Sequence, residues 1–289
     1  MLLGIIAALS ASFFWTYGCF LWRKQTKFLS PININLIKNI IAFILFSPLL
    51  ITIDFNYNLK GVLLLLISGM LGISIGDSLY IASLRILGTR RTLSIEALAP
   101  ILASLLGSIW LRESQELRVW IGILLVTLSL LCIALRKTEF SEPKHTEISL
   151  AKGYFFAFLS VLFAVVAASL SRLALNSSNI NPFQSTEIRL FGSLLLLGTF
   201  NNINLNNMCS QLSLDSRKDI IYATFLGTNL GILLQQYVFQ NLPLGLGWTL
   251  LSTSPLISLF FASAEGEVVD YLTILMSISV IIGVAIVFL

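Results

Sequence analysis

One stretch of the sequence, residues 72–113, decides the fold: GISIGDSLYIASLRILGTRRTLSIEALAPILASLLGSIWLRE. It contains two apolar segments separated by the polar sequence GTRR. Three of its residues recur at a constant distance (227 − 72 = 231 − 76 = 255 − 100 = 155), so that Gly72, Gly76 and Pro100 correspond to Gly227, Gly231 and Pro255. A Gly-x-x-x-Gly pair followed by a mid-segment proline, twice in one chain, indicates an internal duplication.

The composition of the chain is that of an integral membrane protein. Hydrophobic residues make up 56% of 289 and charged residues 11%, with a mean hydropathy of +0.90. Soluble domains are roughly 45–50% apolar and about 25% charged. A membrane-spanning helix needs about 20 residues, so this length accommodates about ten spans. The basic residues lie between the apolar segments, which gives no support for nucleic-acid binding.

The predicted fold class is an all-α integral membrane protein, because a backbone exposed to lipid must satisfy its own hydrogen bonds. The apolar segments predict ten helices: Leu2–Leu21, Pro31–Thr52, Gly61–Leu84, Thr92–Leu111, Arg118–Leu135, Gly153–Leu173, Phe183–Phe200, Asp219–Gln240, Gly245–Ala262 and Tyr271–Leu289. We expect a first repeat over residues 1–135, a solvated polar linker over 136–152 and a second repeat over 153–289. The interval Asn201–Lys218 is expected to be a surface loop.

The duplication extends beyond the opening stretch. Gly4 and Arg23 correspond to Gly153 and Arg172 at an offset of 149 (153 − 4 = 172 − 23 = 149), and Lys38 corresponds to Arg189 at 151 (189 − 38 = 151). Small differences in loop length between the copies account for the drift in offset. Five helices per copy is an odd number, so the two repeats must be inverted in the membrane, an arrangement typical of secondary transporters.

The chain resembles the drug/metabolite transporter superfamily, in its EamA-type branch. The resemblance rests on GDSLYIASLRILG, LSIEALAPILASLLG and the LRE that ends at Glu113, and on a basic residue early in the second helix of each copy, Lys38 and Arg189. It implies a multi-pass permease of the cell membrane, the inner membrane in a bacterium. The second copy departs from the pattern, because Asp77 corresponds to Ile232 and Glu113 to Val268.

Ionisable residues inside spans are candidate functional groups, since each costs roughly 2.5–3.5 kcal/mol at mid-helix. They are Lys38, Asp77, Glu96, Glu187 and Arg189. One interpretation is that the acids pair with Lys38 or with neighbouring arginines and hold helices together; the other is direct contact with a substrate or a proton. We expect Lys38 to neutralise one acid, leaving the other, Glu96 beside Pro100, to face a cavity.

Uncharged residues complete the set of candidate binding or coupling residues. Tyr80 shares a helical face with Asp77. The two prolines are expected to kink their helices, as architecture alone or as a pocket wall. The second repeat offers hydrogen-bonding groups around an aromatic ring: Asn229, Gln235, Trp248 and Thr249.

The sequence contains too few candidate catalytic or metal-binding residues to predict an enzyme. The single histidine, His145, lies in the linker, and the three cysteines form no C-x-x-C pair. We therefore expect no catalytic residue, metal or cofactor. The sequence has no Gly-x-x-x-x-Gly-Lys-Ser/Thr motif, so ATP is not expected as the direct energy source.

The sequence thus predicts a secondary transporter that exports a small organic metabolite, such as an amino acid, by alternating access. Its expected partners are a small-molecule substrate and the lipid bilayer, with protons as a candidate coupling ion. A non-transporting membrane scaffold or partner subunit is the alternative. The oligomeric state, a monomer included, stays open. So does the orientation, because the basic loops place both termini outside, whereas the family resemblance places them inside.

Overall fold

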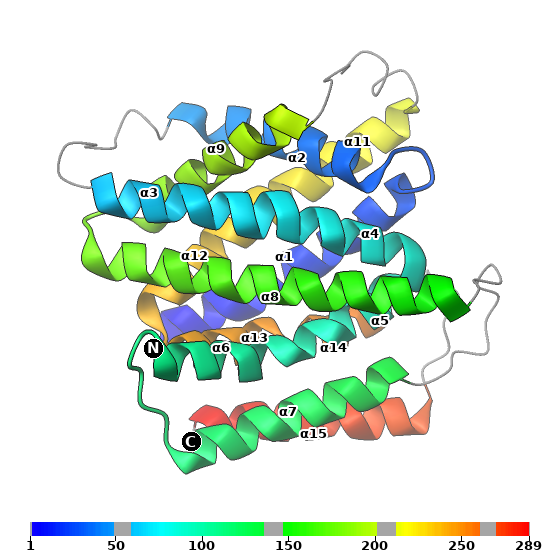
Figure 1. Ribbon diagram of the computed structural model, residues 1–289. Coiled ribbons are helices and arrows are strands. Elements are labelled where there is room, and N and C mark those ends of the chain that lie inside the picture. The colour runs from blue at the N-terminus through cyan, green and yellow to red at the C-terminus, as the bar shows by residue number, and fades with distance from the viewer. Residues whose placement is uncertain (1, 49–58, 136–146, 201–211, 261–269, 289) are drawn as a thin grey trace.

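The computed structural model describes residues 2–48, 59–135, 147–200, 212–260 and 270–288. These ranges form a bundle of helices (Figure 1). The first half consists of α1 (Leu2–Gln25), α2 (Pro31–Phe46), α3 (Leu59–Ser68), η2 (Gly69–Gly76), α4 (Asp77–Leu87), α5 (Thr89–Ile95), η3 (Glu96–Leu98), α6 (Ala99–Ile109) and α7 (Leu117–Leu135). The second half consists of α8 (Glu147–Ser177), α9 (Pro182–Phe200), α11 (Leu214–Ala223), η4 (Thr224–Leu230), α12 (Gly231–Asn241), α13 (Leu244–Leu251), α14 (Ser254–Ser258) and α15 (Tyr271–Phe288).

Each of the ten predicted spans has a counterpart in the described ranges, four of them as interrupted helices. These are α3–η2–α4, α5–η3–α6, α11–η4–α12 and α13–α14. Four helical stretches are long and apolar enough to cross a membrane by length and composition: Leu2–Gln25, Leu59–Leu87, Arg91–Ile109 and Ser149–Ser177.

Two predicted polar segments are partly helical, which corrects their boundaries. Helix α8 begins at Glu147, inside the predicted linker 136–152. Helix α11 begins at Leu214, inside the predicted loop Asn201–Lys218, because the Ser213 side chain caps it by accepting a hydrogen bond from the Ser216 backbone N–H. Polar residues extend both helices beyond their apolar parts. The predicted ends at Thr52, Ala262 and Leu289 lie outside the described residues.

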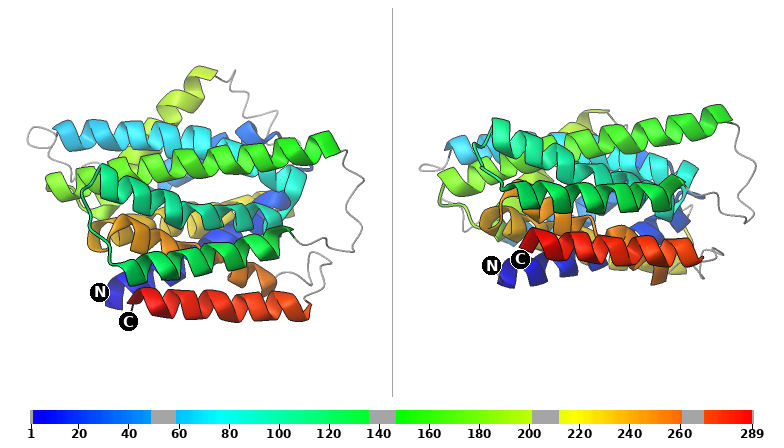
Figure 2. Two further views of the ribbon diagram at one scale, coloured as in Figure 1. Left: turned by 60° about the horizontal axis from the view of Figure 1, so that its bottom comes forward. Right: turned by 90° about the horizontal axis from the view of Figure 1, so that it is seen from below.

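The two halves run in opposite directions through the bundle. Helix α1 begins at the end of the bundle where α15 finishes, whereas α8 begins at the opposite end (Figure 1). Helices α7 and α15, the last of each half, pack against each other and also run antiparallel (Figure 2). The structure is therefore that of an inverted duplication.

The third span of each half contains widened, π-helical turns at equivalent positions. Segments η2 and η4 begin at Gly69 and Thr224, which are again 155 positions apart (224 − 69 = 155). Such turns are rare and often lie at functional sites. The repeated Gly-x-x-x-Gly pattern accompanies them.

The fourth span of each half is interrupted just before its proline. Pro100 and Pro255 each occupy the first turn of a new helix, α6 and α14. A proline fits there because the first N–H groups of a helix have no partner within it. The predicted kinks are thus present as helix breaks.

Glycines bring η2 close to its neighbours. A Cβ built on Gly69 would lie 2.0 Å from the backbone oxygen of Arg189 in α9. A Cβ on Gly72 would lie 2.7 Å from that of Ala167 in α8. Close backbone approach of this kind is how helices associate in lipid, where apolar burial gives little driving force.

The outer helix faces carry apolar side chains, as a bilayer requires. Several large ones are more than half exposed: Ile109, Leu117, Leu128 and Ile281. An apolar surface of this extent is unusual for a soluble monomer and is suited to contact with lipid tails.

Replacing Gly69 by alanine is expected to destabilise the protein, because the new methyl group meets backbone rather than a side chain that could rotate away. We expect the thermal transition of the detergent-solubilised protein to fall by roughly 2–10 °C. The matched control is Gly198→Ala in α9, where nothing lies within 4 Å. It should leave the transition unchanged or raise it. Equal transitions in the two variants would contradict the packing argument.

Candidate functional site

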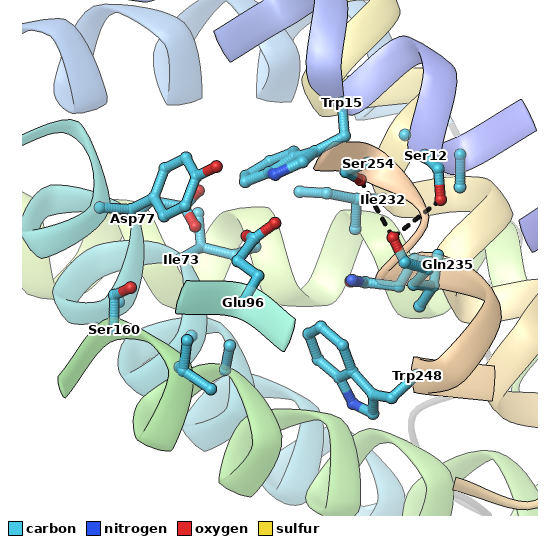
Figure 3. A pocket seen from close by; sticks show the side chains of 18 of the residues that line it. Ser12, Trp15, Ile73, Asp77, Glu96, Ser160, Ile232, Gln235, Trp248 and Ser254 are labelled. Carbon is cyan, nitrogen blue, oxygen red and sulfur yellow. Dashed lines mark hydrogen bonds between the residues drawn. The ribbon is translucent and has the colours of Figure 1, made fainter. Parts of the chain in front are cut away.

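A central cavity of about 80 Å³ lies between the two halves. On this scale one buried water needs roughly 10–15 Å³, so there is room for several waters or a small solute. The π-helical segment η2, helix α12 after η4, and the breaks before Pro100 and Pro255 contribute to its wall. The lining residues are Ala11, Ser12, Trp15, Gly72, Ile73, Gly76, Asp77, Tyr80, Glu96, Ser160, Val161, Ala164, Arg189, Gly231, Ile232, Gln235, Trp248, Leu251 and Ser254 (Figure 3).

Lys38 and Asp77 form an ion pair at one side of the cavity. Lys38 on α2 is fully buried, and Asp77, at the start of α4, lines the cavity. The Lys38 ammonium also lies over the rings of Trp22 and Trp15, 4.8 and 5.9 Å from their centroids. The expectation that Lys38 neutralises one of the two acids is therefore confirmed, and that acid is Asp77.

Glu96 is the acid that faces the cavity without an ion-pair partner in the described structure. It begins η3 at the helix break before Pro100. Its carboxyl group points toward Trp15 (Figure 3), and Trp15 and Tyr80 are its hydrogen-bonding neighbours. A carboxyl group held by two neutral donors keeps the capacity to exchange a proton or to bind a cationic group.

Serine hydroxyls donate to the carbonyls four residues before each proline, where the proline lacks the N–H that an α-helix would supply. Pro255 cannot donate to the Leu251 carbonyl, which instead accepts from Ser12 at 2.9 Å and from Ser254 at 3.0 Å (Figure 3). The Glu96 carbonyl, four residues before Pro100, accepts from Ser252 at 3.3 Å. The prolines therefore shape the cavity wall through these carbonyls without lining it.

The remaining wall combines aromatic and amide groups. The Trp248 ring packs against Phe239, with 6.0 Å between ring centroids. Its indole N–H is buried and has no hydrogen-bond partner in the described structure. Gln235 on α12 also faces the cavity. These groups suit a solute with an apolar body and a few polar atoms.

The structure separates the predicted candidates into two groups. Six line the cavity: Asp77, Tyr80, Glu96, Arg189, Gln235 and Trp248. The other five do not: Lys38, Pro100, Asn229, Thr249 and Pro255.

Two residues of the second group have structural bonds of their own. Asn229 donates to the Ala42 carbonyl at 2.9 Å, joining η4 to α2. Thr249 donates to the Gly245 carbonyl at 2.8 Å, within its own helix. Contact of these two with a solute would require their side chains to rearrange.

Several lining residues were missing from the predicted set, notably Ser12, Ser160, Ile232 and Ser254. The sequence did contain a signal for Ile232, because this residue corresponds to Asp77 at the 155 offset (232 − 77 = 155). The serines had none, since serine is common in the interior of membrane helices. No three His, Cys, Asp or Glu residues gather into a metal-binding group within the described ranges.

Comparison with known proteins agrees with this architecture. The EamA-like transporter family model matches residues 2–135 and 151–289. An uncharacterized transporter from Archaeoglobus fulgidus is 27% identical over 225 residues, which cover 68% of this chain and 77% of the relative. A solved crystal structure aligns with a TM-score of 0.70 and 13% identity, covering 98% of this chain and 95% of the other. The latter shows a shared fold.

Replacing Lys38 by methionine should leave the Asp77 carboxylate without its partner. Removing one member of a buried pair is strongly destabilising, by about 3 kcal/mol or more, so we expect the thermal transition to fall by roughly 6–12 °C. The double variant Lys38→Met/Asp77→Leu should recover most of this loss.

The control for this pair is Asp215→Ala, which breaks the exposed contact with Lys218. It should change the transition little, because exposed ion pairs contribute little. A double variant as unstable as Lys38→Met alone would show that the ion pair is not the cause.

Proposed function

The chain belongs to the EamA-like transporter family, and from this premise we propose that it is a secondary transporter that carries a small organic metabolite by alternating access. The family consists of transporters rather than enzymes. The observation that carries the proposal is the central cavity, because residues of both inverted halves line it. Solute sites of secondary transporters lie at this kind of repeat interface.

We propose each half as one structural unit, the first ending at residue 135 with α7 and the second beginning with α8 at Glu147. The proposed location is the cell membrane, the inner membrane in a bacterium. Export is the favoured direction, from the resemblance to EamA-type permeases. The cavity volume and its tryptophans favour a solute the size of an amino acid.

A polar network at one end of the bundle supports alternating access. Arg172 on α8 forms an ion pair with Glu113 in the α6–α7 connection and donates to the Phe239 carbonyl at 2.5 Å. The other Glu113 oxygen accepts from the Leu244 backbone N–H at 2.8 Å. These bonds join α8, the α6–α7 connection, α12 and α13 at the end where α1 begins (Figure 1). We propose that the network closes the cavity on this side and breaks in the opposite state.

Reconstitution tests the proposed function directly. Purified protein in proteoliposomes should exchange internal and external radiolabelled solute in counterflow, with a panel that includes amino acids. Protein-free liposomes give the background. Exchange of no solute by folded protein would favour the alternative of a non-transporting scaffold or partner subunit.

Proton coupling is assigned to Glu96, because it faces the cavity while Asp77 is neutralised by Lys38. The ionisable groups that interact with it are Asp77, Tyr80 and Cys19. Glu96→Gln should abolish accumulation driven by a pH gradient while counterflow and protein level stay near wild type. If Glu96→Gln still accumulates solute at the wild-type rate, the coupling role passes to Asp77, to be tested with Asp77→Asn.

The closing network predicts a change in accessibility. Glu113→Gln weakens the contact with Arg172, so the state open at this end should become more populated. A cysteine at Ser12, in a background where Cys19, Cys132 and Cys209 are serine, should react with an impermeant maleimide several-fold faster in this variant. The control is Glu116→Gln, which breaks an exposed pair with Arg118. Unchanged labelling in Glu113→Gln would argue against a closing role.

A further inference from the structure

Arg189 is a buried cation at the cavity wall that forms no ion pair in the described structure, although Asp77 attracts it at longer range. It lies on α9, is 4% exposed and lines the cavity. Its Nε and Nη1 atoms are buried and make no hydrogen bond within the described residues. A Cβ built on Gly72 would lie 3.3 Å from Nη2, so the guanidinium packs close against this glycine.

The duplication explains why Arg189 is unpaired. Its counterpart in the first half, Lys38, is neutralised by Asp77. The residue that corresponds to Asp77 in the second half is Ile232, which also lines the cavity. The second half has thus kept the base and lacks the acid. Glu187, also on α9, does not compensate, because both of its carboxylate oxygens are buried without a hydrogen-bond partner in the described structure.

An unpaired guanidinium inside a membrane protein is costly, and such residues mark solute or ion pathways. The planar donor fork of arginine matches a carboxylate, which it binds through two parallel hydrogen bonds. We propose that Arg189 binds the carboxylate group of the transported solute. This carboxylate pairs with Arg189 as the Asp77 carboxylate pairs with Lys38.

The charges around the cavity favour a single carboxylate over a phosphate. Lys38 and Asp77 are in direct contact and cancel in net charge, and Asp77 attracts Arg189 only from a longer distance, so Arg189 is left as the net positive charge of the three. Glu96, when ionised, adds a negative charge, which the amino group of a zwitterionic solute would balance. A monoanion balances Arg189, whereas a phosphate dianion would leave excess negative charge in a site surrounded by lipid. Trp15 and Trp248 then lie beside the apolar body of the solute.

This inference rests on the proposed transport function, but its test measures binding alone. Four matched compounds serve as probes for the detergent-solubilised protein: butyrate, butyramide, 2-aminobutyrate and 2-aminobutanamide. We expect butyrate or 2-aminobutyrate to raise the thermal transition and to quench tryptophan fluorescence at millimolar concentration, with their amides inactive. Binding of 2-aminobutyrate alone would assign a zwitterionic solute, and binding of both acids would assign the carboxylate alone.

Two cavity variants test the role of the guanidinium. Arg189→Gln should weaken carboxylate binding roughly tenfold or more. Its stability without solute should equal or exceed that of wild type, because no bonded partner is left behind; a purely structural arginine would predict a loss. Ile232→Asp restores the acid that the first half carries, so it should neutralise Arg189 and also abolish carboxylate binding.

Lys218→Gln is the control, since it removes one exposed positive charge that does not line the cavity and should leave binding unchanged. The proposal is overturned if no carboxylate probe binds, if inorganic phosphate binds in their place, or if Arg189→Gln and Ile232→Asp bind carboxylates as wild type does. Carboxylate binding without counterflow would instead reject the transport function and keep the site.

Discussion

The two halves of this protein are joined by hydrogen bonds to backbone carbonyls that face a proline, which lacks an N–H, in place of their usual α-helical donor. In the bilayer no bulk water can satisfy such groups. Ser12 of the first half donates to the Leu251 carbonyl of the second, and Ser252 of the second half donates to the Glu96 carbonyl of the first. This reciprocal arrangement places both helix breaks at the centre of the molecule. The cavity, the position of Glu96 and the placement of both prolines follow from it.

The duplication could be predicted from the sequence because the repeated residues occupy positions where few other residue types fit. Glycines at close helix approaches and prolines at helix breaks recur at a fixed offset, and the offset predicted both the helix order and the inverted arrangement. The widened turns of η2 and η4 could not be predicted, since they change hydrogen bonding without changing the apolar pattern. The start of α8 at Glu147 was missed because its first turn is polar and carries no apolar signal.

The candidate site was predictable where a charge inside a span costs free energy. That cost singled out Asp77, Glu96 and Arg189, which the structure gathers around one cavity. Neutral side chains were less predictable. Asn229 and Thr249 are polar, yet their hydrogen bonds go to the Ala42 and Gly245 carbonyls. Only the three-dimensional arrangement separates a polar group that binds backbone from one that faces a cavity.

The widened turns have a consequence for how this chain can vary. Each residue of an α-helix advances the side chains by about 100°. Segment η2 begins with Gly69, which contacts the backbone of α9, and ends just before Asp77, which pairs with Lys38. Removing or adding a single residue between them would turn α4 away from its partners while α3 stayed in place. The number of residues in this stretch is therefore under as much constraint as their identity. The same holds for η4, whose length sets the rotation of α12. Each third span can therefore change length only if the surfaces that it packs against change as well.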